Sequence, residues 1–499
     1  MVTTSDYKNL KARCIKRVWL EKNNKSALED KNNERLEESI LIKELGRKLR
    51  DNGTLINYNN IDLMVHQTNA IINNDKIIYN ATFKYDDICI KCDILEHDND
   101  KWNIYLTKSS VSIEKKYYAE LAIQCYVLQN LGYKVGNINI AYINNEYIRE
   151  NELEINKLFN IKNVTEQVIE LIKDVEENIS LIKDIIKEDI EPDVELGQYC
   201  LKENDAKKAS DCECRKYCFR NIPQNSIFDI SGTYLKTPKK FKLYREGIIE
   251  FKDLIKVKDL SDNVKIQVEC ELNDSKKINR EEIVKFIDKL EYPLYFLDFE
   301  TFNTAIPPYK GTKPYQQIPF QYSIHYKKMD DSDLKHYEYL AKEGIDSTRE
   351  FAERLIEDLG EEGSIVVYNK TFECSRIKEL SNMYEDLRED LLKLNDRVVD
   401  LMDIFSKRFY YQKEMKGSYS IKYVLPALFP NDEELDYEKL NIKNGSMAMN
   451  AFPTLHLKDI SEIKQIREDL LKYCCLDTLA MVRILEKLEQ ECGYNYKLK

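Results

Sequence analysis

The spacing of apolar residues predicts alternating strands and helices in both halves of the chain. In the first half, residues 88–95 and 101–106 predict two paired strands, and a helix is expected around residues 118–128. In the second half, residues 294–297 predict a short buried strand, and helical spacing returns over residues 470–485. Strands interleaved with helices in this way predict an α/β fold.

Two acidic residues follow the predicted strand at residues 294–297, with one residue between them. Because alternate residues of a strand share a face, Asp298 and Glu300 should project together beside apolar surroundings. Carboxylates placed so close repel each other unless they share a proton or a cation. Hard oxygen ligands suit Mg²⁺ or Mn²⁺. Two solvated acids at a strand end would give the same pattern, so the other acids of this half decide the interpretation.

Further candidates lie on a middle and a late segment. Residues 364–368 predict a buried strand that runs into a helix starting near Thr371, which places Glu373 in the first helical turn. Tyr473 and Asp477 are four residues apart on the late helix and therefore share a face.

These motifs, in this order, resemble those of the DEDD exonucleases of the RNase H-like fold, and the tyrosine resembles that of the DEDDy subgroup. The resemblance implies that four acids hold two Mg²⁺ or Mn²⁺ ions and that Tyr473 orients the attacking water. The implied ligands are Asp298, Glu300, Glu373 and Asp477. Glu373 departs from the pattern, because these families more often have Asp at its position.

Two loops rich in tyrosine, lysine and amides are candidate nucleic-acid contacts. They cover residues 304–323 and 416–423, although a purely structural role is equally consistent with their composition. The candidate contacts are Tyr309, Lys310, Lys313, Gln317 and Lys422. Together with the acid motifs, these segments resemble a bacterial family known as domain of unknown function 2779, through nearly the whole chain. In that family a RecB-like nuclease domain precedes the DEDD-type domain.

Four cysteines of the first half are candidate metal ligands. Cys14 lies in a predicted basic helix over residues 8–18, and Cys200, Cys212 and Cys218 follow much later. One early and three late cysteines resemble the arrangement in iron–sulfur RecB-type nucleases, which implies a [4Fe–4S] cluster. Four-thiolate zinc fits the same residue types, free buried thiols are a further alternative, and Cys214 could replace Cys212.

The remaining cysteines and the histidines carry no recognisable chemistry in the sequence. Cys475, like the others, is expected to be an ordinary buried thiol. None of the five histidines, His325 and His336 among them, forms a recognisable Ser/His/Asp or Cys/His arrangement.

The first half resembles a PD-(D/E)XK nuclease that has lost a catalytic acid. Asp93 and Lys108 match the motif, but Leu106 stands where the second acid belongs and cannot bind a metal ion. Gln124 matches the glutamine of the RecB-type helix and would contact DNA or cap a strand. We therefore expect a degenerate front site, with an acid from elsewhere in the domain as the alternative.

The organisation expected from these features is a RecB-like domain at residues 1–222, a helical connector at 223–288 and an RNase H-like domain at 289–499. The net charge of −12 counts against coating of nucleic acid by bulk attraction. With neither a long apolar stretch nor a signal peptide, a cytoplasmic protein is expected.

The expected function is metal-dependent 3′–5′ exonuclease activity on nucleic acid. By analogy with RecB-like proteins single-stranded DNA is favoured, and RNA is possible. The alternative is a non-catalytic nucleic-acid-binding subunit of a DNA processing or defence complex. Protein partners are not indicated.

Overall fold

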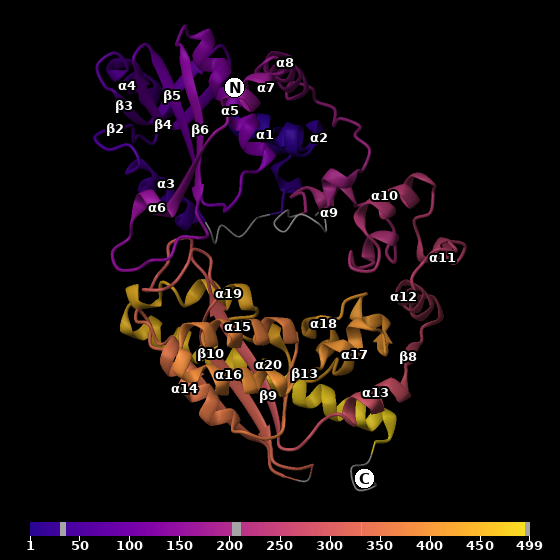
Figure 1. Cartoon of the computed structure of the whole chain (residues 1–499). Helices are drawn as coiled ribbons and strands as arrows, with labels where there is room; N and C mark the ends of the chain where they lie inside the picture. The colour runs from indigo at the N-terminus through magenta and orange to yellow at the C-terminus, as the bar shows by residue number, and fades with distance from the viewer. Residues whose placement is uncertain (30–35, 202–210, 331, 495–499) are drawn as a thin grey trace. The chain divides into compact units, whose positions relative to one another are not determined.

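A computed structural model describes residues 1–29, 36–201, 211–330 and 332–494. The chain divides into two compact units (Figure 1). Unit 1 contains residues 1–221 and 304–315, and unit 2 contains residues 222–303 and 316–499. The expectation of an α/β fold is confirmed in both units, since each pairs a sheet with helices.

Unit 1 is built on a sheet with the strand order β2-β3-β4-β5-β6-β7, and β1 pairs with β4. Its strands are β1 (Val2–Thr3), β2 (Thr54–Leu55), β3 (Ile77–Tyr85), β4 (Ile88–Asp98), β5 (Lys101–Lys108), β6 (Val135–Ile143) and β7 (Phe159–Asn163). Its helices are α1 (Thr4–Ala12), α2 (Ile15–Asn23), α3 (Leu36–Arg47), α4 (Ile61–Ile71), α5 (Lys115–Asn130), α6 (Ile155–Leu158), α7 (Thr165–Ile172), α8 (Val175–Ile185) and α9 (Arg215–Cys218). The predicted strands over 88–95 and 101–106 form the antiparallel pair β4–β5, and the helix that follows them is α5.

The predicted single helix over residues 8–18 is wrong. The chain leaves helical geometry at Arg13 and Cys14, so that α1 ends at Ala12 and α2 begins at Ile15. Cys14 has extended backbone angles and precedes α2 as its N-cap residue. The continuous amphipathic pattern hid this break, because the apolar stripe continues across it.

Unit 2 is built on a mixed sheet with the strand order β11-β10-β9-β12-β13, beside a small β14–β8 pair. Its strands are β8 (Lys276–Ile278), β9 (Leu294–Phe302), β10 (Ile318–Lys327), β11 (Lys335–Leu340), β12 (Ser364–Val367), β13 (Val398–Asp400) and β14 (Tyr410–Gln412). Its helices are α10 (Thr237–Arg245), α11 (Phe251–Leu254), α12 (Asp262–Asn273), α13 (Arg280–Ile287), α14 (Thr348–Leu359), α15 (Lys370–Met383), α16 (Arg388–Asp396), α17 (Met402–Ser406), α18 (Ile421–Leu428), α19 (Gly445–Ala451) and α20 (Ile460–Cys492). Strands β9, β12 and β13 run parallel, and β10 and β11 run antiparallel to their neighbours.

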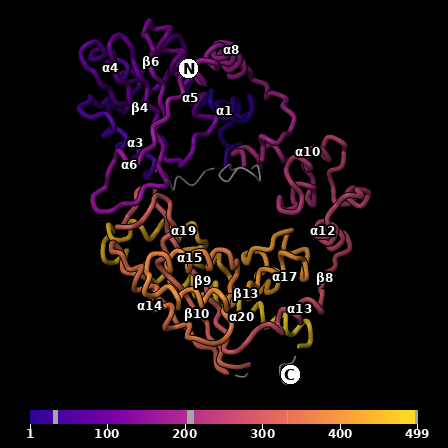
Figure 2. Tube along the Cα trace, viewed as in Figure 1, coloured from indigo at the N-terminus to yellow at the C-terminus, as the bar shows by residue number. Residues whose placement is uncertain are grey.

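The two faces of the unit 2 sheet have different coverings. Tyr295, Leu297 and Phe299 of β9 point toward a core that α14, α15 and α16 complete. The alternate residues of β9 point to the opposite face, where α20 packs across β9, β10 and β11. The N-terminal part of unit 2 also reaches α20, because α13 packs against it (Figure 2). This arrangement puts Asp298 and Glu300 between β9 and α20.

Within the described ranges, no helix is both long enough and apolar enough to span a membrane.

Candidate functional site

Three carboxylates converge where β9 meets α20. Oxygen atoms of Asp298, Glu300 and Asp477 all lie within 4.8 Å of one another. Asp298 and Glu300 share a face of β9 because they are two residues apart, and Asp477 faces them from α20. Glu300 and Asp477 are each 6% exposed, which leaves little water to separate their charges. These three side chains therefore form a candidate cation site, called here the three-acid group.

Burial makes the charged forms of these acids unfavourable. It raises the pKa of Asp477 to about 6, and burial and the neighbouring acids raise the pKa of Asp298 and of Glu300 well above the usual range. Lys422 opposes these shifts, but burial lowers its own pKa. A divalent cation would stabilise the ionised carboxylates, and hard oxygen donors of this kind suit Mg²⁺ or Mn²⁺.

Glu373, the fourth predicted ligand, is buried but does not belong to the three-acid group. It lies in the first turn of α15 with 2% of its surface exposed, and its Oε2 has no hydrogen-bond partner. Burial, followed by the charge of Asp298, raises its pKa well above the usual range. An unpaired carboxylate oxygen this close to Asp298 fits an additional cation ligand, direct or through water.

The backbone before Glu373 is held by another acid. Asp400, at the end of β13, accepts hydrogen bonds from the backbone N–H groups of Asn369 and Lys370, at 3.1 and 2.9 Å. Asn369 has a φ of 106°, a region that asparagine tolerates better than most residues. Asp400 thus fixes the backbone at the start of α15.

A small pocket opens beside the acids. It has a volume of about 230 Å³, and Asp298, Glu300, Asp477, Tyr473 and Lys422 all line it. The Lys422 ammonium lies 5.4 Å from the centre of the Tyr473 ring and donates to the carbonyl of Lys443 at 3.2 Å. The pocket therefore combines carboxylates, a phenol and an ammonium group within one chemical site.

Sequence reasoning missed Tyr437 and Gly445 at this site. The Tyr437 hydroxyl donates to Asp477 Oδ1 at 2.5 Å, and Gly445 lies at the start of α19. A Cβ added at Gly445 would lie 3.7 Å from Glu300 Oε2 and 4.0 Å from the Tyr473 hydroxyl. Both residues come from the segment between α18 and α20, which carries no periodic motif that could have identified them.

The predicted nucleic-acid contacts are divided between the two units. Tyr309, Lys310 and Lys313 belong to the segment 304–315 of unit 1, where Arg149 donates to the carbonyls of Pro307 and Pro308. Gln317 belongs to unit 2 and accepts a hydrogen bond from Thr301 at 2.8 Å. Lys422 itself lines the acid pocket, whereas Gln317 is connected to the pocket only through its hydrogen bond with Thr301.

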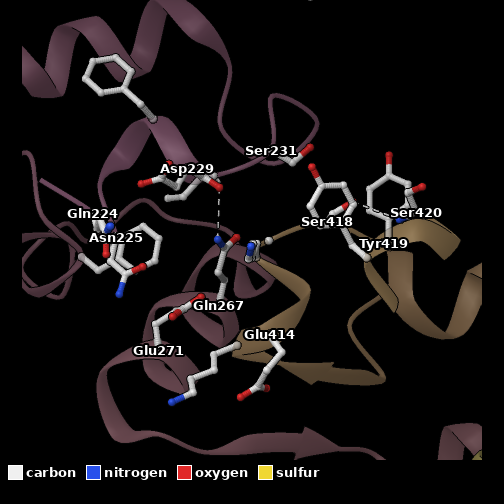
Figure 3. Close-up of a pocket in the computed structure, with 17 residues that line it drawn as sticks. Gln224, Asn225, Asp229, Ser231, Gln267, Glu271, Glu414, Ser418, Tyr419 and Ser420 are labelled. Carbon is white, nitrogen blue, oxygen red and sulfur yellow. Dashed lines mark hydrogen bonds between the residues drawn. The ribbon is translucent and has the colours of Figure 1, made fainter. Parts of the chain in front are cut away.

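A larger cavity of about 1000 Å³ lies on the other side of the segment 416–423. Figure 3 shows Tyr419 and Ser420 at one side of it, with Gln267 pointing toward Asp229 across the middle. Gln267 is 1% exposed and donates to the Asp229 carbonyl at 3.4 Å, but its Oε1 has no hydrogen-bond partner. The Tyr419 carbonyl accepts a hydrogen bond from Tyr368, a residue of the acid pocket. The two cavities are thus neighbours across one short segment.

The candidate cluster cysteines gather within unit 1. Burial, with the nearby thiols of Cys14, Cys212 and Cys218, raises the pKa of Cys200 to about 11. Cys212 differs, because a hydrogen bond from the Cys214 thiol lowers its pKa to about 6. The structure therefore brings the four predicted cysteines together and adds Cys214 as a direct partner of Cys212.

Each residue of the predicted front site is paired with a residue that the sequence did not suggest. Asp93 accepts hydrogen bonds from the Lys43 ammonium and the Thr107 backbone N–H, both at 3.0 Å. The Lys108 ammonium donates to Glu120 of α5 at 2.9 Å. Gln124 donates to the Lys91 carbonyl at 3.0 Å, so its amide holds a strand.

Glu120 is the acid that the sequence search overlooked in unit 1. It is 8% exposed and also accepts a hydrogen bond from Lys8 at 3.1 Å. Leu106, in the motif's acid position, packs in the hydrophobic core. Helical spacing along α5 could have identified Glu120, because it lies one turn before Gln124.

The fold brings together two histidines and a cysteine that formed no recognisable arrangement in the sequence. One nitrogen from each of His325 and His336 and the sulfur of Cys475 lie within 4.8 Å of one another. Cys475 is partly exposed and is therefore not an ordinary buried thiol. The sequence hid this group because its members come from three elements, β10, β11 and α20.

Comparison with known proteins shows similarity to uncharacterized proteins. The chain is 29% identical to an uncharacterized protein of Ureaplasma parvum serovar 3, over 40% of this chain and 32% of that protein. It is 27% identical to an uncharacterized protein of Mycoplasma genitalium, again over 40% of this chain and 32% of that protein. The similarity thus spans about a third of the length of these relatives, and no solved structure matches the chain. Residues 295–420 match the family described as "Domain of unknown function (DUF2779)", which confirms the resemblance to that family over this segment.

Proposed function

We propose that unit 2 is a metal-dependent nuclease that removes nucleotides from the 3′ end of a nucleic acid strand, with single-stranded DNA as the favoured substrate. The observation that carries this proposal is the three-acid group, in which buried carboxylates from β9 and α20 lie within 4.8 Å of one another. The 3′–5′ direction of the proposed reaction rests on the resemblance of the ordered acid motifs to those of the DEDD exonucleases. The single-stranded DNA preference rests on analogy with RecB-like proteins.

The donor atoms at the site fit the proposed ions. Asp298, Glu300 and Asp477 would hold Mg²⁺ or Mn²⁺, and Glu373 would contribute from α15. Bound ions would activate water and offset the charge that develops on phosphate oxygens.

The protein's own groups have separate tasks in this proposal. The Tyr473 hydroxyl, which lines the pocket with the acids, would orient the attacking water. Tyr437 holds Asp477 through its hydroxyl. Lys422 would pair with a phosphate oxygen, since its ammonium lies on the same pocket wall.

The neighbouring cavity of about 1000 Å³ supplies a path for the strand in this proposal. Tyr419 offers a ring on which a base can stack, and Lys416 offers a cation for the backbone. The unpartnered Oε1 of the buried Gln267 provides a hydrogen-bond acceptor inside the cavity. We expect Tyr419→Ala to raise KM more than it lowers kcat, since Tyr419 does not line the acid pocket.

The cysteines of unit 1 would hold an iron–sulfur cluster that ties the start of α2 to α9. Four-thiolate zinc is the alternative that the same residues allow. Arg13 and Lys16 provide positive charge near Cys212 and Cys218, which would stabilise thiolate ligands of either group.

Purified protein incubated with 3′-labelled and 5′-labelled single strands, with Mg²⁺ or Mn²⁺, tests the nuclease proposal. We expect stepwise loss from the 3′ end that is abolished in Asp298→Ala and Asp477→Ala. Asp403→Asn is the matched control, because Asp403 pairs with Lys407 at the surface, outside the acid group. Absence of metal-dependent cleavage on DNA and RNA would contradict the proposal and favour a non-catalytic binding subunit.

A separate measurement tests the cluster. Protein purified without oxygen should be brown and contain iron and sulfide, and Cys14→Ser should lose both. A colourless protein with stoichiometric zinc lost on the same substitution would assign zinc in place of the cluster.

A further inference from the structure

A second group of metal-ligand type lies on the α20 face of the unit 2 sheet, toward its β11 edge. His325 of β10 and His336 of β11 stand directly opposite each other in the strand pairing. Their ring centres are 4.6 Å apart. Cys475 of α20 completes the set, with one donor atom from each residue within 4.8 Å of the other two. Three elements distant in sequence thus bring two imidazoles and a thiol to one point.

Hydroxyl groups hold one nitrogen of each ring. His325 Nδ1 is hydrogen-bonded to the Thr478 hydroxyl at 2.8 Å, and His336 Nε2 to the Ser323 hydroxyl at 2.8 Å. The two hydroxyls are themselves hydrogen-bonded at 2.7 Å. Partners of this kind fix the orientation of metal-binding imidazoles. These hydrogen bonds leave His325 Nε2 and His336 Nδ1 available as donor atoms for a ligand.

The surroundings suit a metal ion. His336 and Cys475 line an open pocket of about 530 Å³ together with Glu338, which lies two residues after His336 on the same face of β11. Glu338 or a water molecule could complete a four-coordinate site.

We propose that His325, His336 and Cys475 bind a transition-metal ion, with zinc as the preferred ion. Two imidazoles and a thiolate are borderline to soft donors, which favour zinc over Mg²⁺. The site differs from the three-acid group in chemistry, and its occupation does not depend on whether unit 2 is a nuclease.

A metal ion bound to these three residues would link the β11 edge of the sheet to α20. Cys475 follows Cys474, whose sulfur lies 3.9 Å from Asp298 Oδ2, so one helical turn faces both sites. Thr478, which holds His325, directly follows Asp477 in α20. A metal bound here would therefore fix the position of the helix that carries Tyr473 and Asp477.

The zinc content of the full chain tests the proposed metal site directly. The parent protein, His336→Ala, Cys475→Ser and Cys492→Ser are loaded with Zn²⁺ in excess Mg²⁺, washed and analysed for bound zinc. Cys492→Ser is the matched control, because Cys492 is a partly exposed cysteine of the same helix outside the group. We expect the parent and this control to retain one more zinc ion per chain than the other two variants.

Co²⁺ in place of Zn²⁺ identifies the ligand, since thiolate-to-cobalt charge transfer reports sulfur ligation. Its absorbance should decrease in Cys475→Ser and stay unchanged in Cys492→Ser, and zinc should raise the melting temperature of the parent and of Cys492→Ser but not of the other two variants. His336 is exposed, so His336→Ala should fold even if Cys475→Ser does not. Equal zinc content and equal cobalt spectra in all four proteins would overturn the proposal.

Discussion

The buried acids of unit 1 and unit 2 are neutralised in different ways. In unit 1, Asp93 contacts Lys43, and Glu120 contacts both Lys108 and Lys8. Although burial opposes them, these lysines leave the pKa of Glu120 lowered. In unit 2, Asp298 and its neighbours have raised pKa values, even though Lys422 lines their pocket.

This difference decides where a metal ion can be useful. Ammonium groups already occupy the positions around Asp93 and Glu120, so a divalent ion would have to displace them. The acids of unit 2 gain from an added cation, because it relieves both their mutual repulsion and the cost of their burial. Similar residue types thus form a charge-paired core in one unit and the proposed cation site in the other.

The largest expected effect is on activity. If unit 2 is the proposed nuclease, Asp298→Asn or Asp477→Asn should lower the rate of strand hydrolysis by about 10³-fold or more, because each removes a proposed metal ligand. Lys108→Ala should leave that rate unchanged, because Lys108 pairs with Glu120 in unit 1 and the proposed reaction takes place in unit 2. The measurement is the initial rate of 3′ release in Mg²⁺.

Substrate binding measured by anisotropy is the control for the Asn variants, and it should persist in the presence of metal. If Lys108→Ala removed activity while both Asn variants kept it, the active acids would be those of unit 1 and the comparison would be reversed.

The next effect concerns stability without metal, and its sign should differ between the units. Asp298→Asn should raise the free energy of unfolding by about 1 kcal/mol. Burial raises the pKa of the Asp298 carboxyl, so its charged form is unfavourable in the folded state, and asparagine cannot ionise. Glu120→Gln should lower it by about 3 kcal/mol, because Lys108 and Lys8 lose a buried partner. Denaturant unfolding in a chelator measures both.

Excess Mg²⁺ provides the control, since it should reverse the sign for Asp298→Asn and leave Glu120→Gln unaffected. A loss of stability in both variants in the chelator would mean that the acids of unit 2 are compensated by the protein itself.

The sequence was informative where residues of one site follow one strand or helix, and less so where they come together from several elements. The spacing of Asp298 and Glu300 predicted their shared face, and the four-residue spacing of Tyr473 and Asp477 predicted theirs. Tyr437 and Glu120 were missed because their partners lie 40 and 12 residues away. Such contacts depend on tertiary packing, which local periodicity does not encode.

The same limit explains the errors in the sequence interpretation. His325 and His336 become neighbours only through the register of β10 and β11, and a one-residue change of register would separate them. The break at Cys14 lies within an apolar stripe that suggests one continuous helix.

A smaller effect is expected on the pH dependence of metal binding. In the folded, metal-free chain the pKa of Asp477 is about 6, above its ordinary value of 3.8, so the folded state binds more protons than the unfolded state between these values. The free energy of unfolding without metal should therefore decrease as pH rises through about 6. The apparent affinity for Mn²⁺ should increase over the same range, because the ion displaces those protons.

Calorimetry in two buffers with different ionisation enthalpies would count the protons released when Mn²⁺ binds. The part of this release that comes from Asp477 should be larger at about pH 6 than at about pH 8, because Asp477, with a pKa of about 6, is already ionised at the higher pH. Equal release at both values would mean that the acids are ionised before the metal arrives.

The smallest effect concerns Lys422, the lysine that interacts with the acids of unit 2 as other lysines do with the acids of unit 1. Lys422→Gln should tighten Mn²⁺ binding about threefold to tenfold, since it removes a positive charge that faces Asp477, Glu300 and Asp298. It should also raise KM for the strand, because the ammonium no longer meets a phosphate. Lys443→Gln is the matched control, as that lysine pairs with Glu438 at the surface. Weaker Mn²⁺ binding in Lys422→Gln would show that the lysine holds the acids in place, and unit 2 would then resemble unit 1 more closely than their pKa shifts indicate.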